Sequence, residues 1–140
     1  MKIVVSTVVN AALQEVWRAY TTPLDIMRWN AASSDWHTTA ATVDLRPGGK
    51  FSSRMEAKDG SFGFDFAGEY IRVLPFELIE YTFGGRLGLV EFTPVTGGVR
   101  VQVTFDSEDI HSEAQQREGW QAILDNFARH VDGKSDVTPP

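Results

Sequence analysis

The chain has 140 residues, 42% of them hydrophobic and 23% charged, which is typical of one folded domain. Its net charge is -6 without a basic cluster, so binding to nucleic acid, which depends on neutralising phosphates, is not expected. The absence of cysteine excludes disulfide bonds and thiolate chemistry. The apolar stretch at residues 3–13 is interrupted by polar residues and has no cleavage pattern, so we expect a cytoplasmic protein without membrane insertion.

The first part of the chain predicts a strand followed by a helix. Residues 2–9 are rich in β-branched side chains, which favour strands. Asn10 is a good helix N-cap, and apolar residues recur at helical spacing after it. A short amphipathic helix is therefore expected over residues 11–21.

A second helix is predicted to begin at Thr22 and to end near Trp29. Pro23 would occupy its first position, where a missing N–H costs no hydrogen bond. Residues 30–37 are small and polar apart from Trp36, which predicts a surface loop. In that loop Trp36 would either close the mouth of a cavity or seal the core.

From residue 38 onward the pattern changes to the two-residue period of strands, interrupted by glycine-rich turns. Strands are predicted over residues 38–45, 50–57, 61–74, 78–83, 88–94 and 99–106. Strands joined by short turns form an antiparallel meander, and the N-terminal strand would add a seventh member. One face of the third predicted strand carries Phe62, Phe64, Phe66, Gly68 and Tyr70, more rings than a flat sheet needs.

Residues 112–131 predict the long helix around which the chain is organised. Its large apolar residues share one helical face and are Trp120, Ile123, Leu124, Phe127 and Val131. Ser112 and Gln115 form a capping box at the start, and Gly133 is a plausible stop. Gly119 costs about 1 kcal/mol relative to alanine inside a helix, which indicates that something approaches the helix closely there.

These elements predict an α+β fold, in which a curved seven-stranded antiparallel sheet wraps around the long C-terminal helix. Two short helices would lie between the first and second strands. We expect one domain over residues 1–133 and a disordered tail at residues 134–140, which have nothing to bury.

Several motifs resemble the START-like, or SRPBCC, superfamily with its helix-grip fold. They are V-W-R-A at 16–19, Trp29, V-D-L-R-P-G-G-K-F at 43–51, G-E-Y at 68–70, and G-W at 119–120 with Leu124. Within it the chain is most similar to homologues of the activator of the heat-shock-protein-90 ATPase, as a single-domain bacterial-type member. The family's eukaryotic founders carry an additional chaperone-binding domain, which we do not expect within these residues.

The resemblance implies an apolar cavity between the long helix and the sheet. The predicted lining residues are Trp29, Trp36, Phe51, Met55, Phe64, Phe66, Tyr81, Phe92, Trp120, Leu124 and Phe127. Periodicity alone is equally consistent with these residues filling a solid core. Tyr70 and Tyr81 are the better candidates for a polar contact, because a buried phenol needs a hydrogen-bond partner.

The remaining polar residues predict neither a metal site nor a cofactor. Those that alternate with apolar residues on the strands should face water; they are Arg54, Glu56, Asp65, Glu69, Glu91, Arg100, Gln102 and Asp106. His37, His111 and His130 form no metal-binding spacing, and His130 suits the C-terminus of a helix. No phosphate-binding loop, dinucleotide motif or nucleophile elbow is present.

Three functions remain open. The first is binding of a small apolar or aromatic molecule in the cavity, with no catalysis. The second is a polyketide-cyclase-like enzyme that uses the same cavity, for which the sequence offers no obligatory acid or base. The third is a partner of a chaperone of the heat-shock-protein-90 type. A monomer or a weak homodimer is expected.

Overall fold

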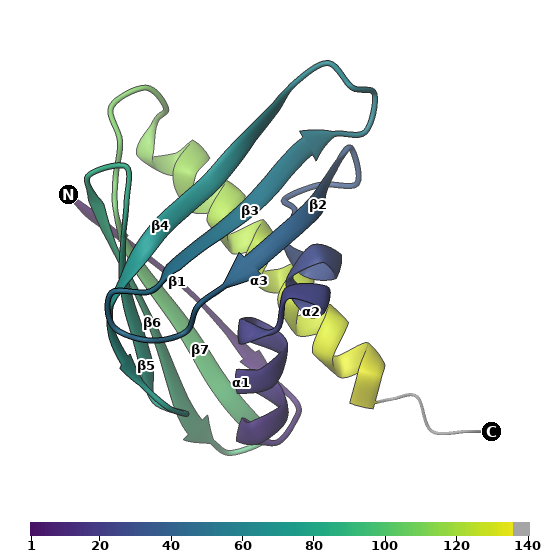
Figure 1. Cartoon of the computed structure of the whole chain (residues 1–140). Coiled ribbons are helices and arrows are strands. Elements are labelled where there is room, and N and C mark those ends of the chain that lie inside the picture. The colour runs from purple at the N-terminus through teal and green to yellow at the C-terminus, as the bar shows by residue number, and fades with distance from the viewer. Residues whose placement is uncertain (136–140) are drawn as a thin grey trace.

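The computed structural model describes residues 1–135 and shows a seven-stranded antiparallel sheet curled around a long C-terminal helix (Figure 1). The elements are β1 (Lys2–Val9), α1 (Leu13–Thr21), α2 (Pro23–Trp29), β2 (Trp36–Val43), β3 (Lys50–Ala57), β4 (Gly63–Leu74), β5 (Leu78–Phe83), β6 (Arg86–Val95), β7 (Gly98–Asp106) and α3 (Glu113–Ser135). The predicted fold class and order of elements are confirmed.

The sheet has the order β1-β7-β6-β5-β4-β3-β2, so the first strand lies beside the last one. Strands β2 to β7 form the predicted meander, and β1 pairs antiparallel with β7 from Lys2↔Asp106 to Val9↔Val99. The register shifts once in β2 and once in β4, after Tyr70. Such irregularities bend strands and increase their twist, which favours a sheet that curls.

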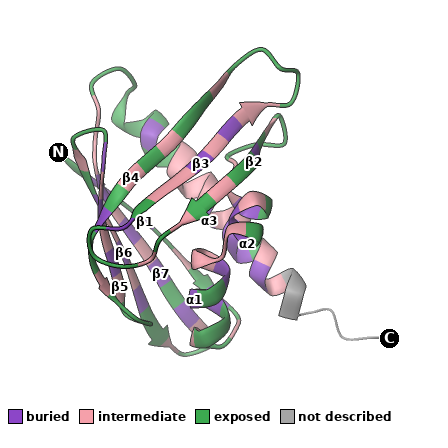
Figure 2. Cartoon of the chain, viewed as in Figure 1, coloured by how far each residue is buried: buried purple, intermediate pink, exposed green. Residues whose placement is uncertain are grey.

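The two halves of the sheet pack differently against the helix. Phe105 of β7, Ile3 of β1 and Phe127 of α3 have no exposed surface. By contrast, β2 and β4 each bury a single residue, Thr38 and Tyr70. Figure 2 shows the same difference, with buried residues concentrated on the β5–β7 side of the sheet. Space between the sheet and α3 is therefore expected on the β2–β4 side.

Helix α3 begins with the predicted capping box. The Ser112 N–H donates to Gln115 Oε1 at 3.0 Å, and the Gln115 N–H donates to Ser112 Oγ at 3.1 Å. Next to it, the buried Gln116 donates through Nε2 to the carbonyls of Glu108 (3.0 Å) and His111 (2.9 Å). These bonds fasten the loop between β7 and the helix, so the N-terminal end of α3 is fixed against the sheet.

The predicted stop at Gly133 is wrong, because α3 continues to Ser135. Glycine permits the left-handed conformation that ends many helices but does not force it. The disordered tail predicted for residues 134–140 therefore falls partly within the helix, and residues 136–140 lie outside the described residues. Within residues 1–135, no helix is long and apolar enough to cross a membrane.

Strand β2 and helix α1 begin differently from the prediction. The polar residues 30–37 do not form a loop throughout, because β2 begins at Trp36, which pairs with Ala57 of β3. Helix α1 begins after Ala12 without a side-chain cap, and the backbone N–H of Asn10 instead donates to Asp132 Oδ1 at 3.1 Å. Both errors arise because the decisive partners lie far away in the sequence.

Strand β6 also begins earlier than predicted, at Arg86 and not at Gly88. Arg86 pairs with Phe83 of β5 across the Gly84-Gly85 turn, and the Leu87 N–H donates to the Asp106 carboxylate at 2.9 Å. Gly119 also differs from expectation, since a Cβ there would meet nothing within 4 Å. No part of the described chain therefore approaches α3 closely at that position.

Candidate functional site

A cavity of about 320 Å³ lies between α3, the two short helices and the concave face of the sheet. Its volume falls within the range of about 300–1,000 Å³ that is common for small-molecule sites. Its walls are mostly aromatic and aliphatic side chains from β2 to β7, α1, α2 and α3. A core packed to ordinary density would leave no space of this size.

Two glycines create room for rings in the wall. Gly68 of β4 lies opposite Phe51 of β3, and Gly88 of β6 lies opposite Tyr81 of β5. A Cβ at Gly68 would collide with the Thr82 carbonyl oxygen and lie 2.8 Å from Phe51 Cζ, and one at Gly88 would collide with the Tyr81 ring. Both rings thus lie across the neighbouring strand at a glycine, and at Gly68 the close backbone of β5 requires glycine as well.

The wall beside α3 consists of contacting rings. Trp120 stacks on Phe105, with centroids 3.8 Å apart and planes inclined by 10°. Its indole also lies 5.6 Å from Phe83 and 6.1 Å from Phe66. At the other end of the cavity, Trp29 Nε1 donates to the Ala19 carbonyl at 2.9 Å, which fixes that ring. The wall is thus held by side-chain packing on both sides.

The structure brings most of the predicted lining residues to this cavity. Those in its wall are Trp29, Phe51, Met55, Phe64, Phe66, Tyr81, Trp120 and Leu124. Phe92 and Phe127 instead lie in the core, 4% and 0% exposed, where both contact Tyr20. Trp36 lies in a separate surface hollow near Arg28 and packs against Phe64. That any of these residues contacts a ligand stays a prediction.

Three tyrosines, all that the chain contains, open onto the cavity: Tyr20, Tyr70 and Tyr81. None of their hydroxyls has a hydrogen-bond partner among the described residues. Burial raises the pKa of Tyr70 to about 12, with a further contribution from the charge of Asp44. Burial, and then the neighbouring phenols, also raise the pKa of Tyr20 and Tyr81. At neutral pH these groups are neutral hydrogen-bond donors.

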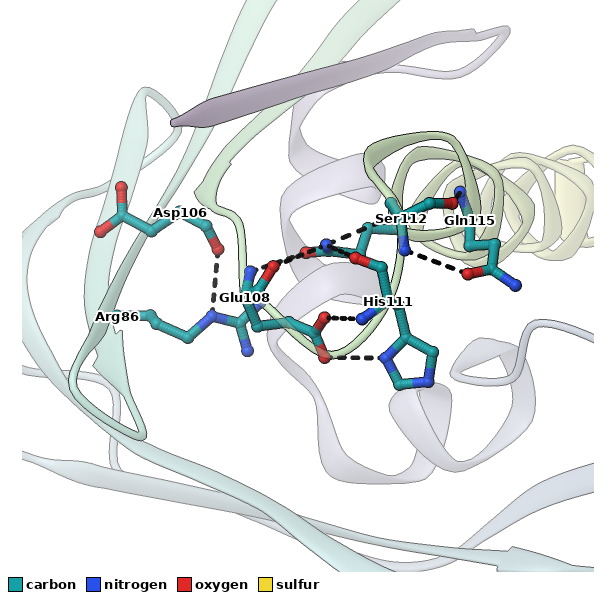
Figure 3. A network of polar contacts seen from close by, with 7 residues as sticks. Arg86, Asp106, Glu108, His111, Ser112 and Gln115 are labelled. Atoms are coloured by element: carbon teal, nitrogen blue, oxygen red, sulfur yellow. Dashed lines mark hydrogen bonds and ion pairs between the residues drawn. The ribbon is translucent and has the colours of Figure 1, made fainter.

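Arg86 is the one charged side chain among the described residues of the cavity wall. Its Nε donates to the Asp106 carbonyl at 3.0 Å, and its Cζ lies 4.5 Å from the centre of the Phe83 ring. Figure 3 shows the guanidinium beside the loop that carries Glu108. The half-buried Arg86 thus places a positive charge at the edge of an otherwise uncharged wall.

The inward position of Arg86 could have been recognised from the sequence. The predicted strand begins at Gly88, which leaves Arg86 in the preceding turn. Along β6 the inward residues alternate, and extending that alternation back from Val90 and Gly88 puts Arg86 on the same face. Tyr20 is in the cavity wall as well, and helical spacing alone gives no signal that its hydroxyl opens onto a cavity.

The arrangement is better suited to holding a molecule than to proton transfer. Among the described residues, no Asp, Glu or His lines the cavity. The phenols keep their protons well above neutral pH, so they are poor general bases. Nor does any group of three His, Asp or Glu within residues 1–135 have the geometry of a metal site.

Comparison with known proteins agrees with this architecture. The family described as "Activator of Hsp90 ATPase homolog 1-like protein" matches residues 10–132. The solution NMR structure of the AHSA1-like protein from Aeromonas hydrophila is 48% identical, with 96% of this chain and 94% of that chain covered and a TM-score of 0.91. The solution structure of Chr148 from Cytophaga hutchinsonii is 38% identical, with 99% and 96% covered and a TM-score of 0.78.

More distant structures share the fold. Protein NE0264 from Nitrosomonas europaea is 19% identical, with 96% of each chain covered and a TM-score of 0.85. No curated protein matches this chain. Because the family match extends over most of the sequence and the similar structures cover nearly the whole fold, the chain belongs to the family of activator of Hsp90 ATPase homolog 1-like proteins, which has the START-like helix-grip fold.

Proposed function

We propose that this protein binds a small hydrophobic or aromatic molecule in the cavity between α3 and the sheet. The observation that carries the proposal is a space of about 320 Å³ walled by rings, into which hydroxyls without partners open. Small-molecule sites commonly combine an apolar wall with a few placed polar groups. A flat ring system or a short acyl chain would fit the aromatic wall.

The entrance is proposed at Phe64 of β4. Phe64 lines the cavity and is also 41% exposed, so it belongs both to the wall and to the surface. Trp36 and Phe62 pack against it, with ring centres 5.9 and 6.2 Å away. An incoming apolar molecule would meet these rings before the interior.

Binding is favoured over the enzymatic alternative because the wall provides donors but no general base in its described residues. The chaperone-partner alternative has no comparable geometric support. The exposed aromatic rings that a partner could use are the same ones that surround the proposed entrance. We therefore put forward the ligand-binding function alone.

The proposal is tested by fluorescence titration with N-phenyl-1-naphthylamine, a neutral apolar probe that brightens in apolar surroundings. Phe64→Ala should weaken binding of the probe. Ile71→Ala is the matched control, since Ile71 is on the same strand, is 46% exposed and lies outside the cavity wall and the entrance. Native mass spectrometry of freshly purified protein should show a stoichiometric apolar adduct, and denaturation would release it for identification. Absence of both the adduct and probe binding would refute the proposal.

A further inference from the structure

The position of Arg86 points to the chemical class of the ligand. We infer that the molecule carries an anionic group, such as a carboxylate or sulfonate, at one end of its apolar body, and that Arg86 binds this group. The inference rests on the proposed function and adds to it a charge and an orientation. The apolar body would lie along the aromatic wall, with its anionic end near β6.

Two contacts hold the Arg86 guanidinium and leave most of its donors free. Only its Nε–H has a hydrogen-bond partner within the described chain, the Asp106 carbonyl. The Phe83 ring supports its face. A guanidinium carries further N–H groups on its two terminal nitrogens, in a planar arrangement that matches a carboxylate. A fixed side chain with free donors is prepared to bind an anion without further ordering.

The neighbouring carboxylates are engaged elsewhere. Asp106 accepts from Lys2 Nζ at 2.6 Å and from the Leu87 N–H at 2.9 Å. Glu108 accepts from the His111 backbone N–H at 2.6 Å and contacts His111 Nδ1 at 2.8 Å (Figure 3). No described residue forms an ion pair with Arg86. The hydrogen bonds with His111 lower the pKa of Glu108 most and the charge of Arg86 lowers it least, so this carboxylate is in electrostatic range without pairing with the guanidinium. Arg86 thus has no direct counter-ion at the edge of the cavity, where an anion would be attracted.

Tyr81 provides a second donor in the same region. Burial raises the pKa of Tyr81, the phenols of Tyr20 and Tyr70 raise it further, and the positive charge of Arg86 acts in the opposite direction. Tyr81 pairs with Gly88, two residues along β6 from Arg86, and both Tyr81 and Arg86 line the cavity. The Tyr81 hydroxyl remains a donor at neutral pH. An anionic group at Arg86 would have a neutral hydroxyl in the cavity beside it.

The inference is tested with two fluorescent probes that differ by one anionic group. N-phenyl-1-naphthylamine is neutral, and 8-anilinonaphthalene-1-sulfonate has the same rings with a sulfonate. Arg86→Met should weaken binding of the sulfonate probe roughly 10- to 100-fold, the range for a lost charge-assisted hydrogen bond. Binding of the neutral probe should change little, because methionine retains the apolar stem.

Arg100→Met is the matched control, since it removes the same charge from an exposed site on the outward face of β7. It should change the affinity for neither probe. Arg86→Lys keeps the charge and should retain part of the preference for the sulfonate. If Arg86→Met weakened both probes equally, or neither, the anionic assignment would be overturned while the proposed function stood. If the wild-type protein bound neither probe and carried no apolar adduct, both proposals would fall.

A measurement on the wild-type protein covers the case in which Arg86→Met does not fold. The side-chain Nε–Hε signal of Arg86 should shift in NMR spectra on addition of the sulfonate probe and stay in place with the neutral one. An Arg86 signal that responds identically to both probes would contradict a role in binding the anionic group.

Discussion

Tyr81 of β5 lies directly opposite Gly88 of β6, and its ring occupies the space that a Cβ at residue 88 would need. Tyr81 also pairs with Tyr70 on its other side. The position of a phenol in the cavity wall thus depends on a glycine in the neighbouring strand. A residue that carries no side chain helps to determine what the cavity presents to a ligand.

Gly88→Ala should therefore displace Tyr81 and strain the wall. We expect a loss of about 1–3 kcal/mol in the free energy of unfolding, the usual effect of overpacking. Affinity for the neutral probe should fall as well, because the ring would move into the cavity or away from it. Urea denaturation and probe titration check both effects. Unchanged stability and affinity would show that the glycine does not position Tyr81.

Gly119→Ala should have the opposite effect on stability. A Cβ at residue 119 meets nothing within 4 Å, so only the helix propensity changes. We expect a gain of up to about 1 kcal/mol in the free energy of unfolding, measured in urea. The variant is also a glycine-to-alanine control for Gly88. A destabilised Gly119→Ala variant would mean that the backbone at this position needs glycine for another reason.

Gln116→Leu should loosen the loop that leads into α3. The substitution keeps an apolar stem but removes the donor to the carbonyls of Glu108 and His111. Leaving buried acceptors without partners costs on the order of 1–3 kcal/mol. Gln121→Leu is the control, because Gln121 bonds to Ser6 at an exposed site. Thermal and urea unfolding should rank Gln116→Leu as clearly less stable than Gln121→Leu.

The raised pKa values of the three tyrosines predict that the protein loses stability at alkaline pH. In the unfolded chain a phenol ionises near its ordinary pKa of 10.0, whereas burial raises the pKa of Tyr70 to about 12 and also raises that of Tyr20 and Tyr81. Above pH 10 the unfolded state then binds fewer protons than the native state, so stability falls as the pH rises. Below pH 10 this contribution is fully present.

Absorbance at the tyrosinate band measures this directly. Because every tyrosine of the chain is in the cavity wall, the native protein should show almost no tyrosinate signal near pH 10. The signal should appear together with the loss of native circular dichroism at higher pH. Replacing Tyr70 by phenylalanine should make the alkaline loss of stability less steep. A tyrosine that titrates normally in the folded protein would contradict its burial.

Patterns within the sequence were enough to predict the order of the elements, the meander and the family. Each of these depends on local signals: the capping box at Ser112 and Gln115, the glycine turns, and the alternation along the strands. It also indicated which residues face the concave side. The start of β2 at Trp36 was missed because its partner, Ala57 of β3, lies far along the chain. The start of β6 at Arg86 was missed because the chain turns within Gly84-Gly85, so that Arg86 already pairs with Phe83.

Which inward residues line a cavity and which fill the core could be seen only once the sheet and helix were packed together. Phe66 and Phe92 both lie on the concave face, yet the first borders the cavity and the second packs against Trp17 and Tyr20. A two-residue period gives the face of a strand but not the distance to the helix opposite. That distance depends on how the sheet curls around α3, and it also leaves the Arg86 guanidinium in the cavity wall.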